Sequence, residues 1–458
     1  DVVNRGVAAY KGKIYLGALD GRLIALDGKT GKVVWSEQTT DPKQPYTITQ
    51  VPRVAKGMVF IGNAGAEYSV RGYVSAYDAE TGKLKWRFYT VPGNPKDGFD
   101  NQPELKKAAE TWYGEWWKFG GGATAWDTIV YDPKTNLVYF GTGNGLSWSR
   151  TVRSKGKGDN LFTASIIAVN ADTGKYAWHY QSVPGDEWDY DVTNPLMTAD
   201  LMIDGKKRHV LMQAPKTSFF YVWDAKTGKL LKADQFAPAN WAFKIDLKTG
   251  RPVENPAVRY TTTKAAIVQP APLGSHNWHP MSYSPRTGLV YIPITESSTG
   301  FMSAEPDKHV VKERAYNTGT ISSHPEIDKL YAQPGALKRG NIRSYLEAFD
   351  PVAGKIVWRT PDQETYGPSG TMVTASDLVF SGDWSGRFNA YDARTGEKLW
   401  STPTQANVVA APSTYTIDGE QYVAILVGAR GLPKGVVRTS AVSANNSRLL
   451  VYKLGAKG

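Results

Sequence analysis

The chain has 458 residues, of which 41% are hydrophobic and 12% aromatic. A chain of this length and composition can bury a sizeable core. No apolar run comes near the length of a membrane-spanning helix, which is about 18 residues. The 54 lysines and arginines outnumber the 43 aspartates and glutamates. The formal charge of +11 predicts attraction to anionic ligands, but the basic residues are scattered singly among turns, so nucleic acid is not an expected partner. Cysteine is absent, which excludes disulfides, thiolate nucleophiles, cysteine-ligated zinc and covalently attached haem within these residues.

An internal repeat runs through the chain. Residues 25–32 read Ala-Leu-Asp-Gly-Lys-Thr-Gly-Lys and lead to Trp35. The aspartate of such a turn accepts hydrogen bonds from the backbone beyond it, and the glycine supplies a positive φ, so each copy predicts two short strands joined by a tight turn. Further copies cover 76–86, 168–178, 222–231, 348–358 and 390–400, and all except the one that ends at Leu231 end at a tryptophan.

Repeats at intervals of about 40 to 55 residues are typical of a β-propeller, in which each repeat forms a four-stranded blade. The sequence therefore predicts an all-β propeller fold. We interpret the tryptophans at a fixed position in the repeat as contacts between neighbouring blades. They are Trp35, Trp86, Trp178, Trp358 and Trp400.

Two insertions interrupt the repeat, one near 92–119 and one near 301–343. The first contains a helical pattern over 103–117, and the second is rich in charged residues and turn formers. Long insertions in a rigid repeat frame usually carry function or cover a surface.

Glycine-rich stretches follow the repeat at blade-sized intervals. They are 62–67, which ends at Glu67; 120–126, which ends at Trp126; and 141–145, which contains Asn144. Each alone is compatible with a simple tight turn. In a propeller the inner segments converge on the central channel, so we expect Glu67 and Asn144 to become neighbours there.

Four acidic residues fall within 186–191. If this stretch is a strand, Asp189 and Asp191 point the same way about 6.5 Å apart and can reach one hard cation. The alternative is a solvated acidic loop, and we expect Asp186 and Glu187 to be solvated in either case.

With these motifs in place, the chain resembles the quinoprotein alcohol dehydrogenases, eight-bladed propellers that use pyrroloquinoline quinone (PQQ). The resemblance implies that 1–458 form a single domain with about seven blades represented. The family has a further amino-terminal blade and a pair of adjacent cysteines before the residues that match 1–5, so this chain is expected to lack that part. The tryptophan repeats carry the resemblance together with 1–6, 65–67, 141–144, 188–189, 213–216 and 276–280.

The resemblance also implies the site residues. Glu67, Asn144 and Asp189 would bind a metal, and Asp189 would also be the catalytic base that takes the alcohol proton. Trp126 would stack under the quinone plane, with Trp278 as a less specific candidate in the same site. A stacking aromatic ring with Arg and Lys donors suits a planar polyanion independently of the resemblance. The carboxylates and carbonyl oxygens of PQQ would be held by Arg5, Thr49, Gly65, Ala66, Thr124, Lys216 and Asn277.

Asp191 bears on the identity of the metal. Two carboxylates and an amide oxygen suit Ca²⁺, whereas a third carboxylate better matches a trivalent ion of similar size. The Asp-Tyr-Asp spacing is similar to that of the lanthanide-dependent members of the family, so a lanthanide ion is predicted, with Ca²⁺ as the alternative. Pairing of Asp191 with a nearby Lys or Arg is a second interpretation.

The implied function is oxidation of small primary alcohols to aldehydes. Electrons would pass to a separate soluble cytochrome c in the periplasm, because the sequence contains no haem-attachment motif; residues 1–20 show no signal peptide, and a homodimer is left open. One alternative is a calcium-dependent PQQ alcohol or sugar dehydrogenase. Another is a non-catalytic propeller scaffold, which needs the repeat but not the acidic residues.

Overall fold

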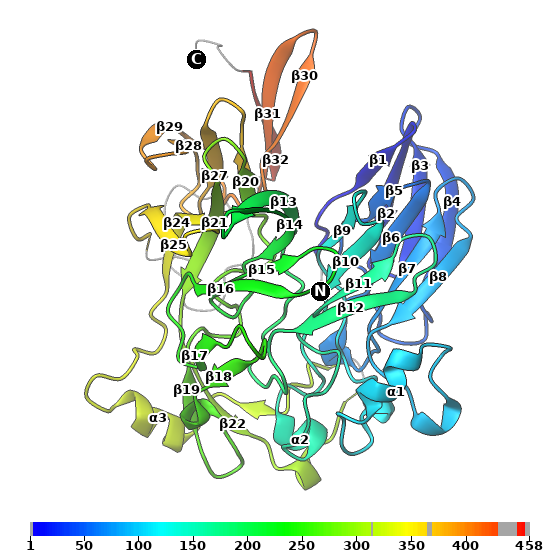
Figure 1. Cartoon of the computed structure of the whole chain (residues 1–458), viewed down its shortest axis with the longest axis vertical. Helices are drawn as coiled ribbons and strands as arrows, with labels where there is room; N and C mark the ends of the chain where they lie inside the picture. The colour runs from blue at the N-terminus through cyan, green and yellow to red at the C-terminus, as the bar shows by residue number, and fades with distance from the viewer. Residues whose placement is uncertain (1–2, 313–314, 364–368, 429–446, 454–458) are drawn as a thin grey trace.

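The structure is a computed structural model that describes residues 3–312, 315–363, 369–428 and 447–453. In these ranges six antiparallel sheets of four strands and a final sheet of three strands follow one another along the chain. Figure 1 shows them succeeding one another around the molecule, from the first sheet in blue to the last in orange. The predicted all-β propeller is confirmed, and the sheets of the described residues match the expected number of about seven blades.

The first four blades are simple meanders, in which each strand pairs with its neighbours in the chain. Blade 1 has β1 (Ala8–Tyr10), β2 (Lys13–Gly17), β3 (Arg22–Asp27) and β4 (Val33–Gln38); blade 2 has β5 (Arg53–Ala55), β6 (Met58–Gly62), β7 (Tyr73–Asp78) and β8 (Leu84–Tyr89); blade 3 has β9 (Ile129–Asp132), β10 (Leu137–Gly141), β11 (Ser165–Asn170) and β12 (Tyr176–Gln181); and blade 4 has β13 (Leu196–Ile203), β14 (Lys206–Gln213), β15 (Phe219–Asp224) and β16 (Leu230–Gln235).

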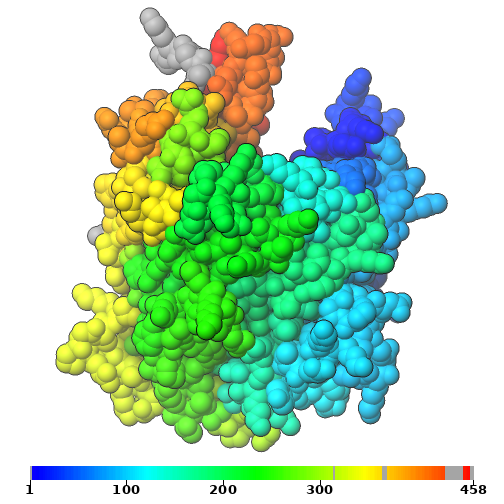
Figure 2. Space-filling model, in the orientation of Figure 1, coloured from blue at the N-terminus to red at the C-terminus, as the bar shows by residue number. Residues whose placement is uncertain are grey.

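The later blades include one that an insertion interrupts between its second and third strands. Figures 1 and 2 show the first and the last blade as separate projections on the same edge of the molecule. Blade 5 has β20 (Ser282–Ser284), β21 (Leu289–Glu296), β24 (Arg343–Asp350) and β25 (Lys355–Arg359); blade 6 has β26 (Thr371–Val373), β27 (Leu378–Gly382), β28 (Arg387–Asp392) and β29 (Lys398–Pro403); and blade 7 has β30 (Ser413–Ile417), β31 (Glu420–Val427) and β32 (Arg448–Lys453).

Three insertions leave the blade frame, and the sequence predicted two of them. The insertion near 92–119 contains η2 (Pro95–Asp97), α1 (Pro103–Ala109) and η3 (Trp116–Phe119), so the predicted helix is correct at its start but ends early. The insertion near 301–343 contains η5 (Pro306–Lys308), β23 (Thr320–Ile321) and α3 (Pro325–Tyr331), and β22 (Thr299–Ser303) leads into it; residues 313 and 314 lie outside the described residues.

The third insertion, between β16 and β20, was not predicted. It contains β17 (Ala242–Ile245), β18 (Pro252–Glu254), η4 (Pro256–Val258) and β19 (Ala266–Val268). Its β19 pairs with β22, so the second and third insertions share one sheet. Figure 1 shows β19 and β22 on the same side of the molecule as α1, α2 (Arg150–Ser154) and α3. No helix in the part of the chain that the structure describes is long and apolar enough to cross a membrane.

The repeat tryptophans join neighbouring blades, as predicted. The indole nitrogen of Trp86 in blade 2 donates a hydrogen bond to the carbonyl of Ala171, which lies in the turn of blade 3, at 2.9 Å. Trp400 follows the pattern only in part, because its side chain is 39% exposed and packs on Tyr452 of β32 with ring centroids 5.3 Å apart. Equivalent hydrogen bonds join Trp35 to Ala79, Trp178 to Ala225 and Trp358 to Ala393 at 3.1, 3.2 and 3.0 Å.

The same contact explains the glycine of each turn that receives an indole, at Gly82, Gly174, Gly228 and Gly396. Gly174 has a φ of +68°, in the left-handed region that favours glycine. A Cβ atom at Gly174 would also lie 2.6 Å from Cδ2 of Trp86, so a side chain would collide with the indole ring. The turn glycine is therefore required both by its own backbone and by the tryptophan of the preceding blade.

Because Trp86 is buried and hydrogen-bonded, Trp86→Ala is expected to lower the free energy of unfolding by about 3–5 kcal/mol. Trp400→Ala is the matched control, and the exposure of its ring predicts a loss of about 1 kcal/mol. Urea unfolding of both variants, followed by far-UV circular dichroism, measures the difference. Equal losses in the two variants would contradict the role assigned to the blade contact.

Candidate active site

Asp189 and Asp191 come together through a turn and not through a strand. Asp189 has a φ of +65°, and the described strands on either side end at Gln181 and begin at Leu196. The carboxylate of Asp186 accepts hydrogen bonds from the backbone N–H groups of Trp188 and Tyr190 at 3.1 and 3.2 Å. The segment is therefore folded back on itself by its own first side chain.

Lys216 connects the two aspartates. Its Nζ atom lies 2.9 Å from Oδ2 of Asp189 and 2.6 Å from Oδ2 of Asp191, and it also donates to the backbone carbonyl of Asp189 at 2.8 Å. All three side chains are buried. Burial raises the pKa of Asp189, while the Lys216 ammonium opposes this shift. Asp191 therefore contacts a lysine, as the second interpretation of this residue requires.

Asn144 and Glu67 lie beside this group. The backbone N–H of Asn144 donates to Oδ1 of Asp191 at 2.8 Å, and Oε1 of Glu67 accepts from Nε1 of Trp148 at 3.1 Å. Burial and the charge of Asp191 raise the pKa of Glu67. The four predicted metal ligands are thus neighbours. Their carboxylate and amide oxygens are the donors that a hard cation prefers. Within the described residues no three acidic or histidine side chains are arranged to hold a metal ion as they stand.

A second group forms around Trp126. The Arg5 guanidinium lies 4.6 Å from the ring centroid of Trp126 and 5.2 Å from that of Trp278, and it donates to the carbonyl of Thr49 at 3.3 Å. The Thr49 hydroxyl in turn donates to the carbonyl of Trp126 at 3.2 Å. Two aromatic faces and a guanidinium are therefore held together, as recognition of a planar anion requires.

Gly143 is where the two groups meet. A Cβ atom at Gly143 would lie 2.6 Å from Oδ1 of Asp191 and 3.2 Å from Nε1 of Trp126. Its N–H donates to the carbonyl of Thr124 at 2.9 Å, and the buried hydroxyl of Thr124 has no hydrogen-bond partner among the described residues. An unpaired buried hydroxyl two residues before Trp126 fits a polar ligand such as PQQ.

The remaining predicted residues are placed less directly. Gly65 has a φ of +105° and precedes η1 (Ala66–Tyr68), which carries Glu67. The side chain of Asn277 is engaged within its own loop, because it donates to the carbonyl of Leu273 and accepts from the N–H of Trp278, both at 2.8 Å. Asp1 and Val2 of the first motif lie outside the described residues.

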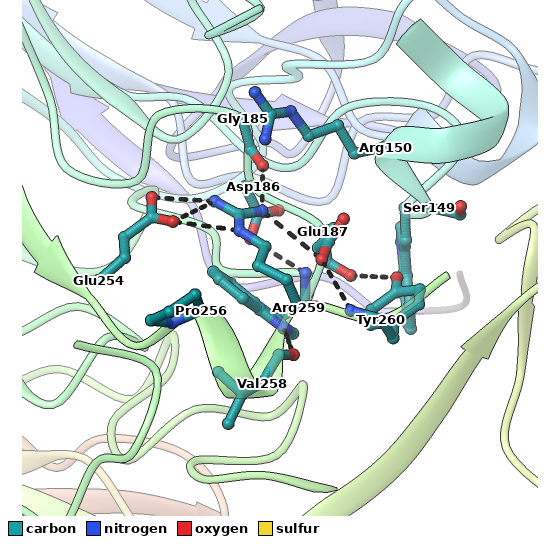
Figure 3. A network of polar contacts seen from close by, with 12 residues as sticks. Ser149, Arg150, Gly185, Asp186, Glu187, Glu254, Pro256, Val258, Arg259 and Tyr260 are labelled. Atoms are coloured by element: carbon teal, nitrogen blue, oxygen red, sulfur yellow. Dashed lines mark hydrogen bonds and ion pairs between the residues drawn. The ribbon is translucent and has the colours of Figure 1, made fainter. Parts of the chain in front are cut away.

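Asp186 and Glu187 are buried, so the prediction that they are solvated is wrong. Their exposed fractions are 0% and 3%. Arg153 donates to the backbone carbonyl of Asp186, and Nη1 of Arg259 lies 3.6 Å from Oε1 of Glu187 while its guanidinium covers the Trp188 ring at 4.3 Å. Figure 3 shows Arg259 between these residues and Glu254. Burial raises the pKa of both carboxyl groups, and the two arginines oppose it.

Sequence reasoning missed three residues near the site. Asp127 lies 3.7 Å from Arg5, and burial raises its pKa to about 7 despite this arginine. Trp148 binds Glu67 through its indole nitrogen, and Asn317 donates to the carbonyl of Glu67. Asp127 and Trp148 lie close in the sequence to Trp126 and Asn144, and this position could have identified them as site residues. Asn317 had no signal beyond its place in an insertion.

Comparisons with known proteins show which family the chain resembles. The model of the PQQ family, described as glucose/ethanol/alcohol dehydrogenase, β-propeller domain, matches residues 2–233 and 255–423. The chain is 51% identical to quinohemoprotein alcohol dehydrogenase ADH IIB of Pseudomonas putida, over 100% of this chain and 65% of that protein. It is 48% identical to the quinohemoprotein alcohol dehydrogenase of Comamonas testosteroni, over 94% of this chain and 60% of that protein.

Two solved structures are also similar. The quinohemoprotein alcohol dehydrogenase ADHIIG of Pseudomonas putida aligns with a TM-score of 0.90 at 47% identity, over 100% of this chain and 67% of its own. A europium-containing methanol dehydrogenase aligns with a TM-score of 0.83 at 35% identity, over 94% and 74%. The chain spans less than two thirds of the length of both curated relatives. Since the family model covers most of the sequence, the chain belongs to the PQQ family of glucose, ethanol and alcohol dehydrogenase β-propellers.

Proposed function

We propose that this propeller oxidises primary alcohols to aldehydes as a PQQ-dependent alcohol dehydrogenase. The observation that carries the proposal is the meeting of the Asp189–Lys216–Asp191 group with the Trp126 group at Gly143. Relatives that are named alcohol dehydrogenases at 51% and 48% identity support it. A scaffold propeller needs the blade contacts but has no use for buried carboxylates beside an aromatic anion site.

The residues have separate roles in this proposal. Asp189 is the catalytic base, whose carboxylate takes the hydroxyl proton of the alcohol, and Lys216 orients that carboxylate. When bound, PQQ would supply the hydride acceptor for the carbinol carbon and the metal would supply a Lewis acid. The metal would be held by Glu67, Asn144, Asp189 and Asp191, and PQQ by Trp126, Arg5, Thr49, Thr124 and Lys216, with Gly65, Ala66, Asn277 and Trp278 completing its site.

The metal we propose is a lanthanide, with Ca²⁺ as the alternative. A third carboxylate, Asp191, adds negative charge next to Asp189 and favours a trivalent ion. The europium-containing methanol dehydrogenase, 35% identical to this chain, supports the same choice. The contact of Asp191 with Lys216 leaves the rival role of an ion-pair partner, so the two roles need to be separated by experiment.

The electron acceptor we propose is a soluble cytochrome c, and the location is the periplasm. The formal charge of +11 favours an acidic acceptor surface. The relatives named quinohemoproteins support a haem as the next electron carrier.

Asp189→Asn is expected to lower kcat by about 100-fold or more, because general base catalysis typically contributes about 10² to 10⁴. Steady-state oxidation of ethanol with a dye acceptor measures this in the PQQ-loaded protein. The absorbance band of bound PQQ should persist. Asp204→Asn, in the exposed turn between β13 and β14, is the matched control and should leave kcat unchanged. Normal turnover by Asp189→Asn would remove this residue from the chemistry.

Titration with La³⁺ and with Ca²⁺ tests the metal. We expect tighter binding and higher activity with La³⁺ in the wild type, and Asp191→Ala should lose at least about tenfold of La³⁺ affinity while Ca²⁺ affinity changes little. Calorimetry measures both affinities independently of turnover. If Ca²⁺ supports equal or greater activity and does so in Asp191→Ala as well, the lanthanide proposal fails.

Salt should slow electron transfer to an acidic cytochrome c. Between about 0.02 and about 0.3 M salt we expect the second-order rate constant to fall by about tenfold, because screening weakens long-range attraction. Stopped-flow reduction of the cytochrome measures it, and a small neutral dye acceptor should be insensitive. A rate constant independent of salt would contradict electrostatic pairing with the acceptor.

A further inference from the structure

The third insertion, between β16 and β20, lies against the acidic turn 186–191. The indole nitrogen of Trp188 donates a hydrogen bond to the carbonyl of Val258 at 3.3 Å. The hydroxyl of Tyr190 donates to the carbonyl of Pro270 at 2.6 Å. These two buried aromatic residues stand directly before and after the candidate base in the sequence. The turn is therefore fastened to the insertion on both sides of that base.

Arg259 of this insertion contacts the turn through both its charge and its plane. Its Nη1 atom donates to the carbonyl of Gly185 at 2.7 Å and lies 3.6 Å from Oε1 of Glu187. Its guanidinium also covers the ring of Trp188, 4.3 Å from the centroid. A planar guanidinium can stack on an indole and bond a carbonyl in its own plane at the same time, which a lysine ammonium cannot. Arg259 therefore fixes the backbone immediately before the candidate base.

Glu254, at the end of β18, holds the same guanidinium. Its Oε1 and Oε2 atoms both accept from Nη2 of Arg259 at 2.9 Å, and Oε2 also accepts from Nε at 3.1 Å. Figure 3 shows Arg259 between Glu254 and the carbonyl of Gly185. A forked pair of this kind fixes the orientation of the guanidinium as well as its place. The contact of Arg259 with the acidic turn therefore depends on the β17–β18 hairpin.

This hairpin lies outside the residues that the family model matches. The model matches 2–233 and 255–423, so Glu254 falls in the gap while Arg259 does not. A second forked pair fastens the hairpin to the loop before β11, where Arg251 donates to the two carboxylate oxygens of Asp159 at 2.8 and 3.0 Å. The pair of Glu254 and Arg259 thus joins a part of this chain that the family model does not include to the turn that carries the candidate base.

The acidic turn needs support from outside itself. Asp189 has a φ of +65°, a conformation that a residue with a side chain keeps only where its surroundings enforce it. The turn also buries four carboxyl groups. Lys216 lies between two of them, and Arg259 is the ion-pair partner of a third, Glu187. A change in the place of Arg259 would therefore let the turn relax and move the carboxylate of Asp189.

We propose that Arg259 is a positioning residue for Asp189, and that Glu254 of the β17–β18 hairpin sets the orientation of Arg259. The inference rests on the proposed alcohol oxidation, because it concerns the candidate base and metal ligand of that reaction. Both residues act through the acidic turn and not on the substrate. A displaced turn should weaken metal binding and slow proton removal, while the binding of alcohol should change little.

Arg259→Lys keeps the positive charge but loses the fork and the stacked plane. The PQQ-loaded protein is titrated with La³⁺ and with Ca²⁺ in a calorimeter. The affinity for the tighter-binding ion should fall by about 10-fold or more, the usual effect of changing a group behind a metal ligand. Steady-state oxidation of ethanol should show kcat lowered by a similar factor and KM changed by less than about threefold. Glu254→Gln keeps Arg259 in place of a removed charge partner and should give smaller losses of the same kind.

Arg251→Lys is the matched control. It makes the same substitution in a forked pair of the same hairpin, but that pair joins Asp159 and not the acidic turn. Metal affinity and kcat should stay at their wild-type values. Urea unfolding followed by far-UV circular dichroism shows whether each variant is folded at the temperature of the titration. If Arg259→Lys does not fold, Glu254→Gln decides alone.

Wild-type metal affinity and kcat in both Arg259→Lys and Glu254→Gln would overturn the positioning role and leave the proposed function intact. Equal losses in these two variants and in Arg251→Lys would also overturn it, because the hairpin would then act only through its stability. A wild type that binds neither ion and shows no PQQ-dependent turnover would instead overturn the proposed function, and the positioning role with it.

Discussion

The buried ammonium group of Lys216 sets the charge and the shape of the candidate site. It holds Asp189 and Asp191 at 2.9 and 2.6 Å, in surroundings from which water is largely excluded. Without a cation between them, two carboxylates this close would raise each other's pKa, and one would be protonated. Removal of one partner from a buried ion pair typically costs about 3–5 kcal/mol. The lysine that blade 4 supplies therefore keeps both carboxylates of the acidic turn charged and close together.

The blade frame explains how such distant residues meet. Glu67, Asn144 and Lys216 lie in the loops β6–β7, β10–β11 and β14–β15, which join the second and third strands of three consecutive blades. Equivalent loops of a propeller lie at the same end of their blades, so a repeat in the sequence becomes a ring of side chains in space. Gly143 then permits close approach, because any side chain there would collide with Asp191.

The sequence predicted what local patterns determine. Turn chemistry and the spacing of tryptophans gave the propeller and the blade contacts, and glycine-rich inner loops pointed to Glu67, Asn144 and Trp126. The prediction that Asp186 and Glu187 are solvated was wrong for a physical reason. Burial of Asp186 and Glu187 depends on Arg153 and Arg259, which are remote in sequence, and no spacing rule connects them. Asn317 was missed because tertiary packing alone brings its insertion to Glu67.

The contact between tryptophan and the next turn has a direction. Blades 1, 2, 3 and 5 offer an indole donor, and blades 2, 3, 4 and 6 accept it with an alanine carbonyl beside a turn glycine, so the association is heterologous, head to tail. A contact of this kind does not limit the number of blades that can follow one another. The number of blades in such a protein is therefore a matter of the rotation between successive units, and duplication of a blade would reproduce its own docking surface on both sides.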